Sequence, residues 1–346
     1  MVFCISSSIS LIVIGLSIKF SGMIHVNDHH GVQKVHAVPT PRIGGVSVFL
    51  AFSYGLWMFQ EISSLILMFW LALLPVFLIG LIEDITLKVS PVKRLLFTFI
   101  SIFIAYYWMD IRVSSIAITF FDELFFNFPG FSLLFTLLIV GGAVHSLNII
   151  DGFNGLLGGY AILALSAVVC VAHSLGDVMI IQLSLITAAS LLGFLVFNFP
   201  FGMIFIGDGG AYVIGFILAI IGLTLVDRHP EISNWFVLLI FVYPITELVY
   251  SIYRRKIVLK TPATQADAEH LHSLIYKKLM ISDWFKHDKA FCNNLTSLFL
   301  WLMSLFGIIP SVVWFDNKSM LITSVLSFMI LYIFIYRVIY GAKIEK

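Results

Sequence analysis

The chain has 346 residues, of which 60% are hydrophobic and only 11% are charged. Its mean hydropathy is +1.04, and its 33 phenylalanines are spread along the whole length. This composition excludes an ordinary soluble protein, and it excludes a soluble domain held by one anchor, so we expect a membrane protein with many spans. The 20 basic residues are balanced by 19 acidic ones, which argues against nucleic acid as a partner.

Polar clusters divide the chain into about eleven apolar stretches, each long enough to cross a bilayer as a helix. The predicted spans are 1–20, 44–60, 64–82, 92–109, 131–149, 155–173, 178–197, 209–226, 233–252, 293–312 and 319–339. Residues 1–18 lack a basic leader and a cleavage pattern, which favours a retained first helix. We therefore expect one all-α, polytopic membrane domain over residues 1–346.

Lysine and arginine are distributed unequally between the two sides that these spans define. When residues at span ends are assigned to the nearer side, seventeen of the 20 fall on the side that holds residues 21–43, 83–91, 150–154, 198–208, 253–292 and the C-terminal tail. The positive-inside rule makes this side cytoplasmic, with the N-terminus outside and the C-terminus inside.

Two connections are long enough to carry structure of their own. The outer loop, residues 109–130, contains the alternating sequence "IRVSSIAITF", which predicts a short hairpin at the outer interface. The large cytoplasmic loop, residues 253–292, has apolar residues at helical spacing, which predicts an interfacial amphipathic helix. Those residues are Leu271, Leu274, Ile275 and Leu279.

Two adjacent carboxylates, Glu83 and Asp84, follow the third span at its cytoplasmic end. A helix C-terminus already carries partial negative charge, so this pair needs a compensating cation. One alternative is a divalent metal such as Mg²⁺ or Mn²⁺, which prefers oxygen ligands. The other is the neighbouring basic group of Lys88, Lys93 and Arg94.

Two more segments combine acids, amides and glycines on the cytoplasmic side. In "NIIDGFNGL", Asn148, Asp151 and Asn154 recur every three residues, which places them along one helical face. The same segment could equally be a glycine turn capped by Asn and Asp. In "GDGG", Asp208 opens a helix whose free amides attract anions such as phosphate.

Basic residues, histidines and one intramembrane acid complete the candidates. Arg42 follows two prolines at the entry to the second span, where it suits phosphate binding or topology anchoring. His270 and His272 begin the predicted amphipathic helix and either contribute to a site or are solvated. Glu247 lies within the ninth span, where a carboxylate is costly enough to mark a candidate site.

All the clusters lie on the predicted cytoplasmic side, and together they suit a metal-bound diphosphate. An enzyme that joins a water-soluble nucleotide to a lipid phosphate would need such a site. A membrane transporter is the alternative from another class, but it should show paired polar interruptions near the midplane of two repeat halves, which the sequence lacks. An inactive scaffold would have no reason to keep Asp84, Asp151 and Asp208 at helix ends.

Five segments, in order, resemble motifs of the polyprenyl-phosphate N-acetylhexosamine-1-phosphate transferases of glycosyltransferase family 4. They are "PTPRIGG" at 39–45, "GLIEDI" at 80–85, "NIIDGFNGL" at 148–156, "IFIGDGG" at 204–210 and "HLH" at 270–272. The predicted eleven spans and termini resemble the polysaccharide-initiating undecaprenyl-phosphate branch more than the ten-span peptidoglycan branch.

The resemblance implies that undecaprenyl phosphate attacks the β-phosphorus of a UDP-N-acetylhexosamine and that UMP leaves. It implies Mg²⁺ or Mn²⁺ as cofactor, the bacterial inner membrane as location, and a product that starts a cell-surface polysaccharide such as O-antigen of lipopolysaccharide or a cell-wall polymer. UDP-GlcNAc is the expected donor, with UDP-FucNAc and UDP-QuiNAc as alternatives, and a homodimer is left open.

The resemblance also implies roles for individual residues. Asp208, with Asn148 or Asp151, would hold the metal. The catalytic acids would be Glu83 and Asp84, which would act on the attacking lipid phosphate, and Asp151. The substrate contacts would come from Arg42 and Lys93 at phosphate, Asn154 and Phe205 near the uridine, and His270 and His272 at the diphosphate.

Three differences from the family pattern stand out, and the last two concern the donor. Glu83 stands where the family usually has Asp, which favours Asp84 as the principal acid. Asn154 stands where the peptidoglycan branch has Asp, and "HLHS" lacks that branch's histidine run. The last two differences point away from UDP-MurNAc-pentapeptide.

Overall fold

The computed structural model describes residues 2–19, 40–58, 63–261, 269–282 and 288–344. Within them every regular element is a helix and no strand occurs. The helices are α1 Val2–Lys19, α2 Gly44–Trp57, α3 Ser63–Thr86, α4 Pro91–Trp108, α5 Thr119–Asn127, α6 Pro129–Ile150, α7 Leu156–Ser174, α8 Val178–Asn198, α9 Gly207–Arg228, α10 Trp235–Ile240, α11 Val242–Tyr253, α12 Leu271–Ile281, α13 Lys289–Val313 and α14 Lys318–Ile344, with a π-helical turn at Arg254–Val258.

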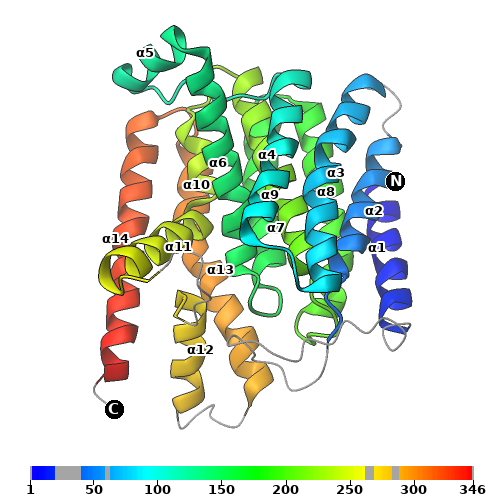
Figure 1. The fold of residues 1–346 in the computed structure, drawn as a ribbon, viewed down its shortest axis with the longest axis vertical. Helices are drawn as coiled ribbons and strands as arrows, with labels where there is room; N and C mark the ends of the chain where they lie inside the picture. The colour runs from blue at the N-terminus through cyan, green and yellow to red at the C-terminus, as the bar shows by residue number, and fades with distance from the viewer. Residues whose placement is uncertain (1, 20–39, 59–62, 262–268, 283–287, 345–346) are drawn as a thin grey trace.

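The long helices form one elongated bundle, with α5 at one end and α12 at the other (Figure 1). In the described part of the chain, seven helices are long and apolar enough to cross a membrane: α3, α6, α7, α8, α9, α13 and α14. Two shorter apolar helices lie within α1 and α2. The chain is therefore a multi-pass membrane protein, whereas the count of eleven spans and the sidedness stay predictions.

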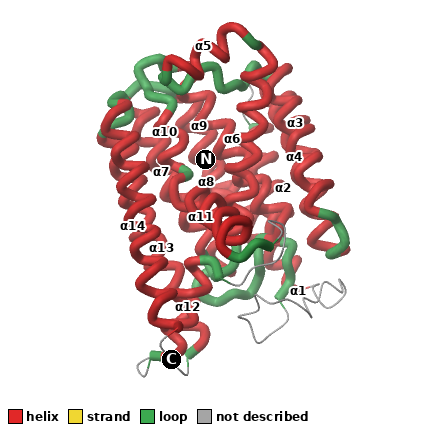
Figure 2. Tube along the Cα trace, turned by 60° about the vertical axis from the view of Figure 1, so that its left-hand side comes forward, coloured by secondary structure: helices red, strands yellow, loops and turns green. Residues whose placement is uncertain are grey.

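The ninth predicted span, 233–252, is broken into α10 and α11. Phe241 ends α10, and Pro244 sits in the first turn of α11, where a proline costs no hydrogen bond because the first amides of a helix have no partner within it. Figure 1 shows α11 running across the bundle, and Figure 2 shows it nearly end-on among helices seen from the side. The break turns α11 toward the end of the bundle that carries α12.

Helix α9 lies at the centre of the bundle. Its apolar window is 89% buried, against 28% for α14, and it packs against α2, α3, α6, α7 and α8. Glycines let its N-terminal turn approach two neighbours closely: a Cβ on Gly80 would lie 2.4 Å from the Cα of Gly209, and one on Gly45 would lie 2.3 Å from the amide nitrogen of Gly210. Helices α2 and α3 thus meet α9 backbone to backbone beside Asp208.

The prediction of a hairpin in the outer loop was wrong. Residues 110–118 contain no strand, and the next regular element is α5. The extended segment bonds to helix α6 through side chains, because the amide of Val113 donates to Thr136 Oγ1 at 2.9 Å and its carbonyl accepts from Ser132 at 2.7 Å. Alternating apolar residues here face a helix rather than a second strand.

Several predicted features lie outside the described residues. They are residues 21–39 of the predicted cytoplasmic side, the ends of the first span at residues 1 and 20, the end of the second span at residues 59–60, the parts 262–268 and 283–287 of the large cytoplasmic loop, and the tail residues 345–346. The described part of that loop contains α12, whose buried residues are Leu271, His272, Leu274 and Ile275.

Candidate active site

A cavity of about 730 Å³ opens where α3, α4, α6, α9, α11 and the start of α12 converge. One part of its wall is polar and charged, and the other part, from α4, α6 and α11, is apolar. The polar wall consists of Arg42, Glu83, Arg94, His145, Asn148, Asp151, Asp208, Tyr212, Arg255, His270, His272 and Ser273. The apolar wall includes Leu95, Phe99, Leu137, Leu138, Leu248 and Ile252.

Asp208, in the first turn of α9, is the centre of the polar wall. Its carboxylate accepts from Arg94 Nη1 at 2.7 Å and lies 3.5 Å from Arg42 Nη2. The side-chain nitrogen of Asn148 donates to the same carboxylate at 3.0 Å, and the Tyr212 hydroxyl lies 3.3 Å from its Oδ2. Four segments far apart in the sequence therefore meet at one carboxylate.

Asp84 lies behind Asp208 and does not line the cavity. It is 2% exposed, and its two oxygens accept the backbone amides of Asp208 at 2.7 Å and Gly209 at 2.9 Å. The partial positive charge of the α9 N-terminus therefore supplies the compensation that the adjacent acids require. This geometry gives no support to the prediction that Asp84 acts on the lipid phosphate, because both oxygens already have backbone partners.

Glu83 is the member of the acidic pair that lines the cavity. Its Oε2 accepts the backbone amide of Val89 at 2.7 Å, which fastens the short connection between α3 and α4. Consecutive residues on a helix point about 100° apart. Glu83 therefore faces the cavity, whereas Asp84 faces the N-terminus of α9.

The structure brings Arg94, not Lys93, to the cavity. Lys93 is exposed and lies outside the lining, whereas Arg94 bonds Asp208. The sequence placed both residues at the start of one helix but did not fix the rotation of that helix. That Lys93 contacts phosphate stays a prediction, and the geometry favours Arg94 for such a contact.

His145 is a second lining residue that the sequence reasoning did not assign. Its Nε2 lies 3.3 Å from Thr98 Oγ1, and its ring meets Tyr212 edge-on with 5.1 Å between centroids. It precedes Asn148 by three residues, the same interval that linked Asn148 to Asp151. Continuing the three-residue spacing from Asn148 toward the N-terminus would have identified His145 as a candidate.

Asp151 lines the cavity just after the end of α6. Burial raises the pKa of its carboxyl to about 7; nearby Arg42 opposes this rise and Asp208 adds to it. At neutral pH this carboxyl is therefore poised to lose its proton when a cation binds beside it.

Asn154 and Phe205 do not line this cavity. The Asn154 amide donates to Asn293 Oδ1 at 2.8 Å, which ties the turn after α6 to α13. The Phe205 amide donates to the Pro41 carbonyl at 2.9 Å, which ties the entry of α2 to the segment before α9. Their expected contacts with uridine stay predictions.

His270 and His272 both reach the cavity wall and are buried. Their rings are stacked, with 5.2 Å between centroids and an interplanar angle of 19°. Burial and, to a smaller extent, His270 lower the pKa of His272 to about 3, against the opposing effect of Glu247. His272 is therefore neutral at physiological pH and can offer an N–H donor but no charge.

The donor set fits a magnesium ion that a phosphate ligand completes. Asp151 and Asp208 offer carboxylates and Asn148 offers an amide oxygen, all hard ligands of the kind Mg²⁺ takes in small number before substrate phosphates and water fill the rest. No group of three or more His, Cys, Asp or Glu side chains in the described part of the chain is arranged to hold a metal alone.

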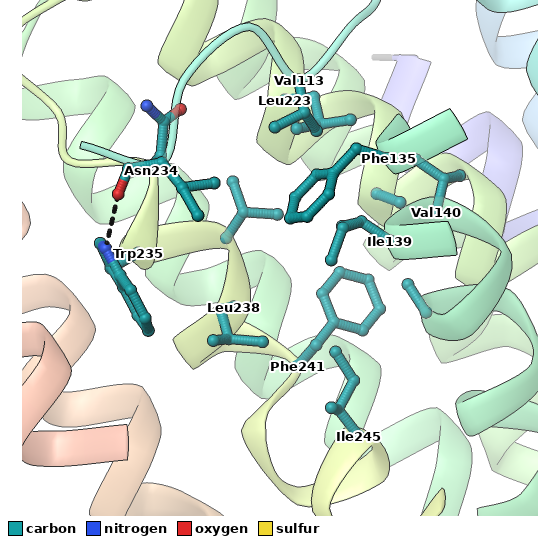
Figure 3. A pocket seen from close by; sticks show the side chains of 14 residues that line it. Val113, Phe135, Ile139, Val140, Leu223, Asn234, Trp235, Leu238, Phe241 and Ile245 are labelled. Carbon is teal, nitrogen blue, oxygen red and sulfur yellow. Dashed lines mark hydrogen bonds between the residues drawn. The ribbon is translucent and has the colours of Figure 1, made fainter. Parts of the chain in front are cut away.

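A second cavity, of about 130 Å³, lies between α6, α9, α10 and α11 (Figure 3). Its 14 lining residues include no ionisable side chain. At its rim, Trp235 Nε1 donates to the Ile116 carbonyl at 3.0 Å, which closes the outer loop over it. Of these two cavities, only the first is lined by ionisable side chains that could take part in a reaction.

Comparison with known proteins agrees with the motifs. Residues 66–226 match the family model for glycosyl transferase family 4. This stretch of the chain is similar to that family. The match runs from α3 to α9 and so includes Glu83, Arg94, Asp151 and Asp208, while His270 lies beyond it.

Curated proteins from several bacteria are similar to the chain, two of the three described below over most of its length. A probable undecaprenyl-phosphate N-acetylglucosaminyl 1-phosphate transferase of Bacillus subtilis is 26% identical over 276 residues, which cover 78% of this chain and 75% of the relative. An undecaprenyl-phosphate alpha-N-acetylglucosaminyl 1-phosphate transferase of Thermotoga maritima is 26% identical over 252 residues, 73% of each chain. A phospho-N-acetylmuramoyl-pentapeptide-transferase of Levilactobacillus brevis is 32% identical over 126 residues, but these cover only 36% of this chain and 38% of the relative.

Proposed function

We propose that this chain transfers N-acetylglucosamine 1-phosphate from UDP-GlcNAc to undecaprenyl phosphate and releases UMP. The observation that carries the proposal is the cavity in which Asp208, two arginines and Asn148 meet beside an apolar wall. A charged wall suits phosphates, and an apolar wall open between membrane helices suits a lipid chain. The names of the similar family 4 proteins from Bacillus subtilis and Thermotoga maritima support the same acceptor and sugar.

In the proposed reaction, a phosphate oxygen of the lipid attacks the β-phosphorus of the nucleotide sugar. The new P–O bond joins the two phosphates, and the bond from the β-phosphorus to the bridging oxygen breaks, so that UMP leaves with that oxygen and its charge. Arg94 and Arg42 carry several N–H donors each. Both can therefore keep their ion pairs with Asp208 while they also donate hydrogen bonds to phosphate oxygens. Positioning and charge stabilisation supply most of the rate enhancement in such a transfer.

We assign Asp208, Asp151 and Asn148 to an Mg²⁺ or Mn²⁺ ion. When bound, the ion would neutralise charge on the diphosphate and on the leaving oxygen. Glu83 faces the cavity and is assigned to the acceptor side, while Asp84 holds the backbone of Asp208 in place from behind.

We further propose that the cavity faces the cytoplasm in a bacterial inner membrane, where UDP-sugars are made. Arg42, Arg94, Arg255 and the histidines all lie on the side that the positive-inside rule makes cytoplasmic. The lipid-linked sugar would then start a cell-surface polysaccharide. UDP-FucNAc and UDP-QuiNAc stay alternative donors.

The test uses the purified full chain in detergent with undecaprenyl phosphate and a panel of UDP-sugars, and it measures UMP release. We expect release with UDP-GlcNAc that stops in EDTA and returns with Mg²⁺ or Mn²⁺. Release with a different sugar only would replace the donor, and full turnover in EDTA would remove the metal. No release with any UDP-sugar, from protein that is folded and monodisperse, would refute the proposed reaction.

A further inference from the structure

Glu247 is a carboxylate buried within α11, with no exposed surface. A charged group in the apolar part of a membrane protein is costly unless it is paired and hydrogen-bonded. Its partners come from the start of α12: Oε1 lies 3.0 Å from His270 Nδ1, and Oε2 accepts the backbone amide of Leu271 at 3.2 Å. One carboxylate thus ties the first turn of α12 to α11.

This contact fixes which nitrogen of His270 is available. The nitrogen beside a carboxylate carries the proton, so Nδ1 donates to Glu247, and the second nitrogen, Nε2, points away from it. His270 also lines the cavity. Because its ring stacks on that of His272, the orientation that Glu247 imposes on one imidazole is passed to the other.

The same peptide is held from a second direction. Both Arg254 and the Tyr336 hydroxyl donate to the backbone carbonyl of Glu269, and Ser251 Oγ lies 3.1 Å from His270 Nδ1. A helix of 11 residues is marginal by itself in water. These contacts from α11 and α14 therefore decide where α12 begins.

We propose that Glu247 is a positioning residue that orients His270, so that its Nε2 contacts the diphosphate of the nucleotide-sugar donor. This inference rests on the proposed function and adds a group that acts through the histidine without touching the substrate. Its role predicts an effect on the donor and none on the lipid acceptor.

The central experiment replaces Glu247 by Gln, which keeps the size and removes the charge. One carboxylate oxygen is replaced by an NH₂ group, which cannot accept a hydrogen bond from His270 or from the Leu271 amide. His270 therefore loses its charged acceptor. We expect the KM for UDP-GlcNAc to rise about tenfold, the change expected when a hydrogen bond worth about 1.4 kcal/mol is lost. The KM for undecaprenyl phosphate should not change, and Glu247→Asp, which keeps the charge, should recover part of the donor affinity.

The matched control is Asp177→Asn, at the N-cap of α8, which packs beside the C-terminal end of α9. Asp177 is also a buried carboxylate beside a histidine, 2.9 Å from His229 Nε2 and 2.7 Å from Arg228 Nε. Its loss should lower the melting temperature and leave both KM values unchanged. An equal rise in the donor KM in this variant would show that the effect of Glu247 is only general destabilisation.

A double-mutant cycle on the donor KM tests whether Glu247 acts through His270. In a His270→Ala background, Glu247→Gln should give no further rise in the donor KM, whereas independent effects would multiply. Hydrogen exchange without substrate provides a second readout, because the amides of residues 270–275 should exchange faster in Glu247→Gln. Unchanged exchange, or multiplying KM effects, would overturn the inference. A wild-type protein that releases no UMP would instead refute the proposed function, and the exchange result would still report on the anchor.

Discussion

Replacing Gly80 by Ala tests whether the backbone contact between α3 and α9 sets the geometry of the site. The added Cβ would lie 2.4 Å from Gly209 Cα, 2.5 Å from Gly209 N and 2.8 Å from the carbonyl carbon of Asp208. Carbon atoms need about 3.5 Å or more. All three neighbours are backbone atoms, so no side-chain rotation can relieve the overlap, and the two helices must separate by roughly 1 Å.

A separation of that size acts on Asp84, one turn after Gly80. Its bonds to the amides of Asp208 and Gly209 are 2.7 and 2.9 Å long, and an extra ångström would take them to roughly 3.7–3.9 Å, beyond hydrogen-bond range. Each such bond to a charged group contributes about 1.5–3 kcal/mol. A displacement of about 1 Å at a catalytic group also costs about a hundredfold in rate. We therefore expect Gly80→Ala to lower turnover about a hundredfold and to lower the melting temperature.

The assay is UMP release at saturating substrates, with thermal unfolding measured on the same preparation. Gly15→Ala in α1 is the control, because a Cβ there meets no atom within 4 Å; it should match the wild type in both measurements. Wild-type turnover and melting temperature in Gly80→Ala would show that α3 and α9 can adjust without moving Asp84, and the reasoning would fail.

Three further changes test the assignment of residues and the orientation. Arg94→Ala should lower turnover at least roughly a hundredfold, whereas the exposed neighbour Lys93→Ala should stay within about threefold of the wild type; the reverse order would contradict the rotation of α4. Asp208→Asn should lower turnover by at least about a hundredfold in protein that still inserts and purifies, and a loss of insertion would favour a structural role. A cysteine at Ser114 should react with an impermeant maleimide in intact cells and one at Ser273 should not, since the opposite pattern would put the cavity on the outer face.

The helices could be predicted from the sequence because each predicted span is a long apolar run between polar clusters. The prediction for 209–226 differs from Gly207–Arg228 by only two residues at each end. The prediction for the outer loop failed for a physical reason. Alternating apolar residues show that one face of the segment is buried, but they do not show whether a strand or a helix covers that face. Residues 110–118 are covered by α6.

The site could be predicted as a set of segments but not as a set of contacts. Charge counting placed "EDI", "NIID", "GDGG" and "HLH" on one side, and the cavity brings all four together. Which of two neighbours faces the cavity depends on helix rotation, and an error of one residue turns a side chain by about 100°. The sequence could therefore not tell Lys93 from Arg94, while the preference for Asp84 over Glu83 came from the family pattern and not from helix rotation.

The N-terminus of α9 shows how the structure changes the chemical argument. The sequence suggested that its free amides would bind phosphate, as helix N-termini often do. Two of those amides are already taken by Asp84, so the helix end is neutralised by the protein itself. Under the proposed function, binding of a diphosphate would then depend on Arg42, Arg94 and the proposed cation at Asp208, because the two arginines are the positive charges that contact Asp208 beside that helix end. Asp84 therefore acts by directing Asp208 and by keeping the amides from the substrate, so a neutral Asn at this position should disturb both roles together.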